Sequence, residues 1–281
     1  MKDRVVLLTG ATEGIGKAAA REFASKGATL VLVGRNEAKT QNLQAKLQNS
    51  TGNPRVETII ADLSLMAGVR ATADTFLSRH ERLDVLANNA GGVFMDYAET
   101  SEGIERTFAL NHLSYFLLTH LLRDRLTSTK GARVVSTSSG AHRQGRLADL
   151  DRVAKNPSRV ASFRAYGDSK LANILFTREL AERLKGTGVA VNCFHPGFVA
   201  TGFGQNNAGL MGWGMRVLAP FVARTPEKGA ETLLWLATND EAGKVNGEYF
   251  MDCQVKRTTS RGRDMKLAGE LWRFSEQLCG I

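Results

Sequence analysis

A tyrosine and a lysine stand four residues apart in Tyr166-Gly-Asp-Ser-Lys170, just before the helix-forming run 171–180. Residues at this spacing lie on the same face of an α-helix, so a phenol and an ammonium group would sit side by side. A free tyrosine has a pKa of about 10, too high for proton exchange near neutrality, and a neighbouring cation favours the phenolate and lowers that pKa. Tyr166 is therefore a candidate general acid or base. This spacing alone also fits an ordinary surface helix.

A glycine motif follows the first predicted strand, in Thr9-Gly10-Ala-Thr-Glu-Gly14-Ile-Gly16. Glycines allow a tight turn and let backbone amides approach a pyrophosphate at the start of the next helix. The spacing G-x-x-x-G-x-G differs from the G-x-G-x-x-G of the common dinucleotide fingerprint. Its position between a strand and a helix nevertheless favours a dinucleotide site.

The end of the second predicted strand carries the signal for cofactor choice. A residue that hydrogen-bonds a free ribose 2′-hydroxyl would be acidic, but the sequence at this strand end is Gly34-Arg35-Asn36. Arg35 offers a fork of donors that suits a 2′-phosphate, which favours NADP over NAD. Glu37 lies close by, although an acidic residue in the first turn of a helix is ordinary dipole compensation. Asp62, after the third strand, is a candidate acceptor for the adenine amino group or a helix N-cap.

Polar residues also mark the ends of later strands and one apolar helix. Ser139 follows the fifth strand, at the carboxyl edge where open α/β sheets bind ligands, and its hydroxyl could donate to a substrate carbonyl. Asn111 is an amide within an apolar helix, where it needs partners and could hold a water or kink the helix. His112 and His195 lack metal-ligand spacing, so we interpret them as structural.

Apolar strand-like runs alternate with helical patterns along the chain, which is typical of a parallel sheet covered on both faces. This predicts an α/β, Rossmann-type, doubly wound seven-stranded parallel sheet within a single domain spanning 1–281. The predicted strands are 4–9, 29–33, 55–61, 85–88, 133–137, 189–195 and 247–250. The predicted helices are 15–25, 37–48, 66–80, 101–126, 163–184 and 227–238.

Two segments interrupt the alternation. Residues 140–162 form a long polar excursion before the Tyr166 helix, and residues 202–224 mix glycines with large apolar side chains such as Trp213. The second composition suits a substrate lid near 202–224, because such loops come from the weakly held part of a fold. A buried irregular packing element is the alternative.

Composition narrows the class of protein. The chain has 281 residues and a net charge of +9, but its Lys and Arg residues are scattered, so we expect no nucleic-acid binding. Three widely separated cysteines indicate reduced thiols and a cytoplasmic location. No apolar stretch is long enough for a signal peptide or a transmembrane segment, and no metal site is predicted.

These motifs, in this order over roughly residues 4–250, resemble the short-chain dehydrogenase/reductase family. The parts that carry the resemblance are 9–16, 88–91, Asn111, Ser139, Tyr166 with Lys170, and Pro196-Gly197-Phe-Val-Ala-Thr201. Arg35, the run 138–142 and Ser169-Lys170-Leu-Ala-Asn173 are similar to its retinol dehydrogenase-like branch. That branch commonly carries an N-terminal membrane anchor, which we do not expect in this chain.

The resemblance implies a catalytic tetrad. Tyr166 would exchange the proton, Lys170 would lower its pKa and hold the nicotinamide ribose, Ser139 would polarise the substrate oxygen, and Asn111 would keep a water in a relay. With the residue-based predictions above, the expected cofactor-binding residues are Gly10, Thr12, Gly14, Ile15, Gly16, Arg35, Asn36, Asp62, Leu63, Asn89, Ala90, Gly91, Tyr166, Lys170, Pro196, Gly197, Val199 and Thr201.

We therefore expect an NADP(H)-dependent oxidoreductase, with NAD as the alternative cofactor. It would interconvert an alcohol and its aldehyde or ketone on an apolar, retinoid-, steroid- or lipid-like substrate. A homodimer or homotetramer is the expected assembly. A dinucleotide-sensing binding protein without turnover is the competing hypothesis, but such a protein would not need the full set of Asn111, Ser139, Tyr166 and Lys170.

Overall fold

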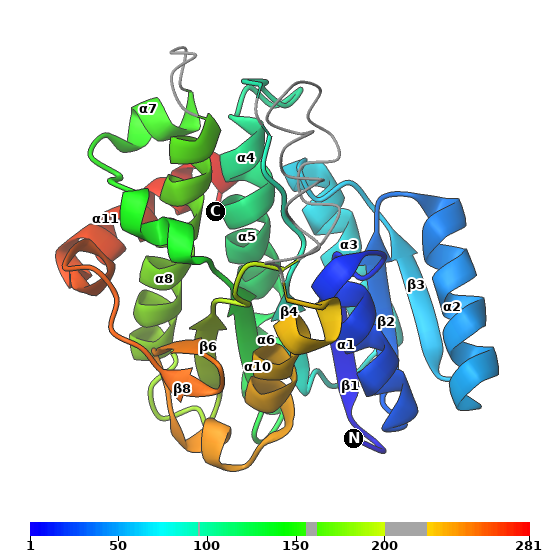
Figure 1. Ribbon diagram of the computed structural model, residues 1–281. Coiled ribbons are helices and arrows are strands. Elements are labelled where there is room, and N and C mark those ends of the chain that lie inside the picture. The colour runs from blue at the N-terminus through cyan, green and yellow to red at the C-terminus, as the bar shows by residue number, and fades with distance from the viewer. Residues whose placement is uncertain (95, 156–161, 200–223) are drawn as a thin grey trace.

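The computed structural model describes residues 1–94, 96–155, 162–199 and 224–281. Their strands form a sheet in the order β3-β2-β1-β4-β5-β6-β7-β8 (Figure 1). The strands are β1 (Val5–Thr9), β2 (Thr29–Gly34), β3 (Val56–Ile60), β4 (Val85–Asn88), β5 (Arg133–Thr137), β6 (Ala190–Phe194), β7 (Tyr249–Met251) and β8 (Gln254–Val255). Every pairing from β3 to β7 is parallel, which confirms the doubly wound α/β class and each predicted strand to within two residues.

The eighth strand was absent from the prediction and runs antiparallel to β7. A tight turn joins the two strands, with positive φ at both Asp252 (53°) and Cys253 (59°). Positive φ at both central residues is the backbone of the hairpin turn that matches strand twist. A two-residue strand carries no alternation of apolar and polar side chains, so the sequence pattern could not reveal it.

Helices cover both faces of this sheet. They are α1 (Gly14–Ser25), α2 (Glu37–Thr51), α3 (Met66–Arg79), α4 (Arg106–Phe108), α5 (Ser114–Leu121), α6 (Arg123–Ser128), α7 (Leu150–Ala154), α8 (Ser162–Arg183), α10 (Pro226–Thr238) and α11 (Met265–Cys279). Short 3-10 turns are η2 (Gly140–Gln144), η3 (Glu241–Lys244) and η4 (Arg261–Arg263), and η1 (Ala109–Leu113) is one π-helical turn. Helices α1, α2 and α10 pack on one face, and α3, α5 and α8 pack on the other.

Alternate residues of each strand supply the two cores, as the period of two requires. In β1, Leu7 belongs to the core beneath α3, α5 and α8, whereas Val6 and Leu8 belong to the core beneath α1 and α10. Both faces of the sheet are therefore buried, which explains why the strands read as continuous apolar runs.

Helix α11, which was not among the predicted elements, adds apolar residues to the core formed by α3, α5 and α8. Asp264 caps its N-terminus, and Gly280 ends it with a φ of 64°. Its Trp272 ring stacks on Phe176 of α8 and meets Phe116 of α5 edge-on, with ring centroids 6.0 and 4.9 Å apart. This helix packs along α8, as Figure 1 shows, and reaches α5 through Trp272.

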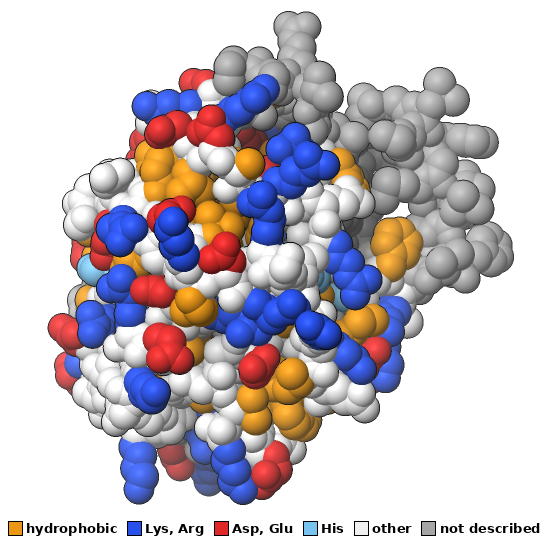
Figure 2. Space-filling view, turned by 90° about the vertical axis from the view of Figure 1, so that its left-hand side faces the viewer, with side chains coloured by type: hydrophobic (Ala, Val, Ile, Leu, Met, Phe, Trp, Pro, Cys, Tyr) orange, Lys and Arg blue, Asp and Glu red, His pale blue; other side chains and the backbone are white. Residues whose placement is uncertain are grey.

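The face of the molecule drawn in Figure 2 carries charges of both signs. On the face in Figure 2, Lys and Arg side chains stand among Asp and Glu side chains, with small apolar groups between them. Among the described helices, none is long and apolar enough to cross a lipid bilayer.

Candidate active site

The loop between β1 and α1 forms the floor of a pocket at the carboxyl edge of the sheet. Gly10 has a φ of 66°, and a Cβ there would lie 2.6 Å from the Ala90 Cα; a Cβ on Gly16 would lie 2.1 Å from the Gly10 carbonyl oxygen. Glycine is therefore required at both positions, because any side chain would separate the loop from its neighbours. Within the described part of the chain, the N-cap residue Glu13 makes no side-chain hydrogen bond to the start of α1. The first amides of α1 are thus left to bind an anion such as a pyrophosphate.

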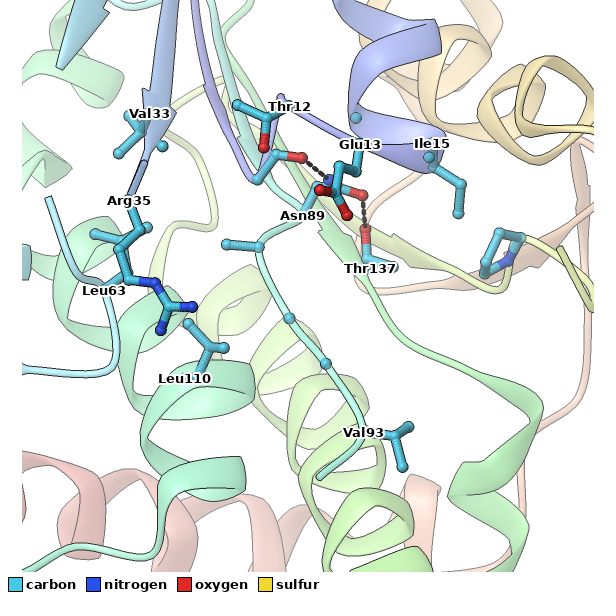
Figure 3. A pocket seen from close by; sticks show the side chains of 18 of the residues that line it. Thr12, Glu13, Ile15, Val33, Arg35, Leu63, Asn89, Val93, Leu110 and Thr137 are labelled. Atoms are coloured by element: carbon cyan, nitrogen blue, oxygen red, sulfur yellow. Dashed lines mark hydrogen bonds between the residues drawn. The ribbon is translucent and has the colours of Figure 1, made fainter. Parts of the chain in front are cut away.

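Hydrogen bonds attach this loop to the end of β4. The backbone amides of Asn89 and Ala90 donate to the Thr9 hydroxyl at 2.9 and 3.0 Å. The Asn89 side chain donates to the carbonyls of Thr9 and Gly10 and accepts from Thr137 (Figure 3). The ends of the three strands β1, β4 and β5 are therefore held as one rigid cradle, which preorganises the pocket for its ligand.

Arg35 and Asp62 mark the end of the pocket beyond β2 and β3. The Arg35 guanidinium lies 3.7 Å from an Asp62 carboxylate oxygen, and 74% of its side chain is exposed. Burial raises the pKa of Asp62, but hydrogen bonds from Ser64 and the Arg35 charge outweigh it and lower that pKa. Figure 3 shows Arg35 beside Leu63, across the pocket from Ile15. Asn36, in contrast, uses its side chain to cap α2 by accepting from the Lys39 amide.

Tyr166 and Lys170 lie one turn apart on α8, and both line the pocket. Tyr166 is buried, and the Ser139 side chain is its hydrogen-bonding neighbour. The Ser139 Oγ accepts from the Ala141 amide at 3.2 Å, which caps the short turn η2. That bond occupies an acceptor position of the hydroxyl, so its proton can be donated to the Tyr166 oxygen or to a ligand oxygen.

Lys170 reaches beneath the pocket rather than toward a carboxylate. Its Nζ donates to the Thr137 carbonyl oxygen at 3.0 Å, and the residue is only 3% exposed. Burial lowers the pKa of Lys170 to about 7 and raises the pKa of Tyr166 to about 12, although hydrogen bonding with Ser139 opposes the second shift. Burial of the two groups dominates both shifts. The expectation that Lys170 lowers the pKa of Tyr166 during the reaction stays a prediction.

Asn111 lies in the π-helical turn and joins three segments. Its amide nitrogen donates to the Gly92 carbonyl at 2.9 Å and to the Ser169 hydroxyl at 3.1 Å, and its oxygen accepts from the Gly92 amide at 2.9 Å. Its own backbone carbonyl accepts from Asn173. A π-turn frequently accompanies a functional site. Here it brings Asn111 between the loop after β4 and the Tyr166 helix.

The two histidines differ in their surroundings. His112 is fully buried, with Asn173 and Ser275 bonded to its two ring nitrogens at 3.3 and 3.0 Å, so it links η1 to α8 and α11. His195 is anchored through its backbone amide, which donates to the Phe250 carbonyl. The described residues contain no group of three His, Cys, Asp or Glu side chains that could hold a metal ion.

The structure brings most of the predicted residues to one pocket of about 330 Å³. Of the candidates, those that line it are Gly10, Thr12, Gly14, Ile15, Gly16, Arg35, Asp62, Leu63, Asn89, Ala90, Gly91, Tyr166, Lys170 and Pro196. Asn36, Gly197 and Val199 lie nearby without lining it, while Ser139 and Asn111 contact lining residues. Thr201 and nearly all of the predicted lid near 202–224 lie outside the described residues.

The segment 196–199 is positioned by its neighbours. Gly197 has a φ of 84°, and a Cβ there would lie 2.6 Å from the Arg224 Cδ. Arg224 pairs with Asp252 and donates its backbone amide to the Phe198 carbonyl at 2.7 Å. On α10, a Cβ at Gly229 would lie 2.7 Å from Val199. Glycine at this position lets Val199 pack closely beside the cradle.

The sequence-based list omits several lining residues. They are Glu13, Val33, Gly34, Ala61, Gly92, Val93, Phe94, Leu110, Thr137 and Ser138. Thr137 and Ser138 directly follow β5, so the rule that ligands bind beyond strand ends could have found them. Val93 and Phe94 lie in the segment 92–98, whose apolar and aromatic side chains indicate a substrate pocket from the sequence. Leu110 carried no such signal, because an apolar residue in a helix resembles any core residue.

Comparison with known proteins gives the same class as the fold and the site. The family described as short chain dehydrogenase matches residues 4–211, and the chain belongs to this family. Mouse retinol dehydrogenase 12 is 41% identical over 279 residues, covering 99% of this chain and 87% of the relative. Bovine dehydrogenase/reductase SDR family member 13 is 40% identical over 284 residues, covering 100% and 74%.

Solved structures agree with these relatives. An uncharacterised protein from Mycobacterium paratuberculosis superposes with a TM-score of 0.79 and 32% identity, covering 99% of this chain and 94% of that one. A short chain dehydrogenase from Escherichia coli CFT073 in complex with NADPH has a TM-score of 0.66 and 28% identity, covering 89% and 96%. The chain is thus an NAD(P)-dependent oxidoreductase of the retinol dehydrogenase-like branch, which interconverts alcohols and carbonyls.

Proposed function

We propose that the protein prefers NADP(H) and acts on an apolar aldehyde, ketone or alcohol. Arg35 is the observation that supports the cofactor preference most directly. Its guanidinium follows β2, lines the pocket and is largely exposed, while the neighbouring Asp62 is itself bonded to Ser64. A planar guanidinium suits a phosphate group better than a free hydroxyl.

The residues present fit a nicotinamide dinucleotide. Gly10 and Gly16 permit the close backbone approach, the uncapped start of α1 offers amides to the pyrophosphate, and Lys170 offers an ammonium group to the ribose. When bound, the nicotinamide supplies or accepts the hydride. The protein's own task is to orient the substrate oxygen and to move one proton.

Tyr166 and Ser139 perform that task in the proposal. In carbonyl reduction, the Ser139 hydroxyl donates to the substrate oxygen, and Tyr166 delivers its proton as negative charge develops on that oxygen. In alcohol oxidation, Tyr166 receives the proton. Lys170 supports the reaction in both directions as a cation beside the phenol. Asn111 hydrogen-bonds both Gly92 and Ser169, and so fixes the loop after β4 relative to α8.

The substrate side of the pocket is apolar. Val93, Phe94 and Leu110 line it, and the Arg106 guanidinium covers the Phe94 ring at 4.0 Å from its centroid. Apolar walls with few polar groups are typical of small-molecule sites. Together with relatives named retinol dehydrogenases, these residues support a retinoid-, steroid- or lipid-like substrate.

A carbonyl panel tests this function. Retinal, steroid ketones, aliphatic aldehydes and aryl ketones would each be incubated with NADPH or NADH, and loss of reduced nicotinamide would be followed by its near-ultraviolet absorbance. We expect turnover of apolar members and faster turnover with NADPH. Tight NADPH binding without turnover of any member would favour the competing hypothesis, a dinucleotide-sensing binding protein.

The wider organisation of the protein follows as part of the same proposal. We propose one NAD(P)-binding domain, because the named strands of the described residues all belong to one sheet. A cytoplasmic location, the absence of nucleic-acid binding and a homodimer or homotetramer stay predictions.

A further inference from the structure

Tyr115 is a buried aromatic residue next to the catalytic lysine. It lies on α5, one turn beyond Asn111, and is 1% exposed. Its ring lies beneath the Lys170 Nζ, 5.7 Å from the ring centroid, while the Tyr166 ring lies 5.6 Å from the same nitrogen. The lysine ammonium therefore faces two aromatic rings, one on its own helix and one on α5.

Lys170 has few other groups to stabilise its charge. The Thr137 carbonyl is its hydrogen-bond acceptor, and this oxygen also accepts from the Asn173 amide at 3.1 Å. Burial lowers the pKa of Lys170, and no carboxylate among the described residues offsets this effect. The titratable groups that face it are Tyr166 on α8, Tyr115 on α5 and His112 on η1, and His112 is neutral near pH 7 because burial lowers its pKa to about 4.

We propose that Tyr115 is a positioning residue for the reaction, whose ring face stabilises the Lys170 cation and so keeps it charged near neutral pH. An ammonium group over an aromatic face is attracted by the ring quadrupole, most strongly where water is excluded. Burial and the neighbouring Tyr166 hold the pKa of Tyr115 well above its usual value, so its phenol remains neutral. The ring, rather than an ionised oxygen, is what it contributes.

This inference rests on the proposed roles of Tyr166 and Lys170, but its first test does not require turnover. The titration midpoint of Lys170 can be followed by NMR on protein labelled with ¹³C-lysine, with the signal assigned by its loss in Lys170→Met. We expect Tyr115→Leu to lower the midpoint by about half to one and a half pH units, because cation–π contacts are worth from about 0.5 kcal/mol at exposed sites to about 2 kcal/mol at desolvated ones. Tyr115→Phe keeps a ring and should leave the midpoint close to wild type.

The matched control is Phe116→Leu. Phe116 is the next residue of α5 and is equally buried, but its ring packs on Phe176 and Trp272 instead of Lys170. Its replacement should cost similar stability without moving the midpoint. An unchanged midpoint in Tyr115→Leu would overturn the proposal, and so would an equal shift in Phe116→Leu or in Tyr115→Phe.

If Tyr115→Leu does not fold, increasingly fluorinated phenylalanines at position 115 keep the shape of the ring while weakening its quadrupole. The Lys170 midpoint should then fall stepwise with fluorination, and a constant midpoint would contradict the proposal. As a second readout, the alkaline limb of kcat/KM for carbonyl reduction should move to lower pH in the same order, because Lys170 would lose its proton earlier. Absence of turnover with any carbonyl would refute the proposed function while leaving the NMR test decisive for Tyr115.

Discussion

In the proposed mechanism, the Tyr166 phenol gives up its proton only when charge develops on the substrate oxygen. Replacing it by phenylalanine keeps the buried ring beside Lys170 and removes the proton. We expect Tyr166→Phe to bind NADPH with nearly unchanged affinity and to lose about 10² to 10⁴ in kcat, the usual cost of removing a general acid. Cofactor fluorescence titration and steady-state rates measure the two quantities. Tyr97→Phe is the control, because Tyr97 bonds Glu99 at the surface; near-normal kcat in folded Tyr166→Phe would exclude Tyr166 as the donor.

Burial of Lys170 also predicts how stability depends on pH. Its pKa is about 7 in the folded protein against 10.5 for an ordinary lysine. Below pH 7 both the folded and the unfolded states hold the proton, so the cost of burying the charge is fully present. As pH rises above 7, only the folded state releases the proton, and the free energy of unfolding increases.

The comparison of wild type with Lys170→Met isolates this effect. The difference in the free energy of unfolding, wild type minus variant, should rise between pH 7 and 9 by about 1 kcal/mol per pH unit. Denaturant titrations at several pH values measure it. The rise should level off near pH 10.5, where the unfolded state also loses the lysine proton. Other groups, such as Cys193, whose pKa burial raises to about 12, are present in both proteins and cancel in the difference. A difference independent of pH would show that Lys170 titrates as an ordinary lysine.

Arg35 carries the prediction for cofactor choice. The free energy that a charge-assisted hydrogen bond contributes is smallest when the bond is exposed. Arg35→Ala should therefore weaken NADPH binding about tenfold and leave NADH binding nearly unchanged. The preference of the wild-type protein for NADPH over NADH should decrease as salt is added, because salt screens the charge of Arg35. Replacement of the exposed Arg257 by alanine serves as a control of equal charge. If Arg35→Ala left the ratio of the NADPH and NADH affinities unchanged, another residue would bind the 2′-phosphate.

Gly34 directly precedes Arg35, but a substitution at Gly34 is a poor test of the preference for NADPH over NADH. A Cβ at Gly34 would lie 2.3 Å from the Thr40 Oγ1, which itself donates to the Asn36 carbonyl at 2.7 Å. Gly34→Asp would therefore disturb the start of α2 as well as place a negative charge beside the phosphate. Arg35→Ala changes the charge without this steric conflict.

The loop between β1 and α1 depends on close backbone contact. Gly16→Ala would put a Cβ 2.1 Å from the Gly10 carbonyl oxygen, so we expect cofactor affinity to fall at least tenfold and stability to fall by about 1 to 3 kcal/mol. Gly269→Ala is the matched control. That glycine lies in α11 with nothing within 4 Å of an added Cβ, and alanine there should raise helix stability by about 0.5 to 1 kcal/mol. Equal effects of both changes would contradict the close packing of the loop.

The strands were predictable because both faces of the sheet are buried. The runs at 85–88 and 133–137 coincide with β4 and β5, whose residues are all buried. The predicted helix 101–126, in contrast, begins at Arg106 and is divided into α4, η1, α5 and α6. Such a division depends on tertiary hydrogen bonds, such as those of Asn111 to Gly92, which a local sequence pattern does not contain.

Helix α11 lay beyond the predicted elements although its sequence carries the usual signals. Asp264 precedes it, Gly280 follows it, and Leu267, Leu271 and Ser275 recur at intervals of four. What the sequence could not show is its partner, because Trp272 meets residues of α5 and α8 that are far away in the chain. The candidate site also divides into what the sequence predicts and what only the fold shows. The sequence predicts strand-end residues such as Asn89. The burial of Tyr166 and Lys170, which shifts their pKa values, is visible only in the folded structure.

At the scale of the whole molecule, the chain carries a net charge of +9. The face in Figure 2 mixes both signs, and several basic residues are used locally, as in the pairs of Lys39 with Glu13 and Arg82 with Asp84. The concentration of glycines, amides and buried titratable groups at the carboxyl edge of the sheet is the stronger signal of function. The central claim is therefore hydride transfer at this edge, with proton exchange by Tyr166.

Isotope transfer tests that claim most directly. NADPH carrying deuterium at the transferable position of the nicotinamide would be incubated with the protein and the apolar carbonyl that the panel identifies, and the alcohol product would be analysed by mass spectrometry. We predict one deuterium on the former carbonyl carbon with wild type, and no product above background with Tyr166→Phe. Alcohol without deuterium, or equal labelled product from both proteins, would contradict direct hydride transfer assisted by Tyr166.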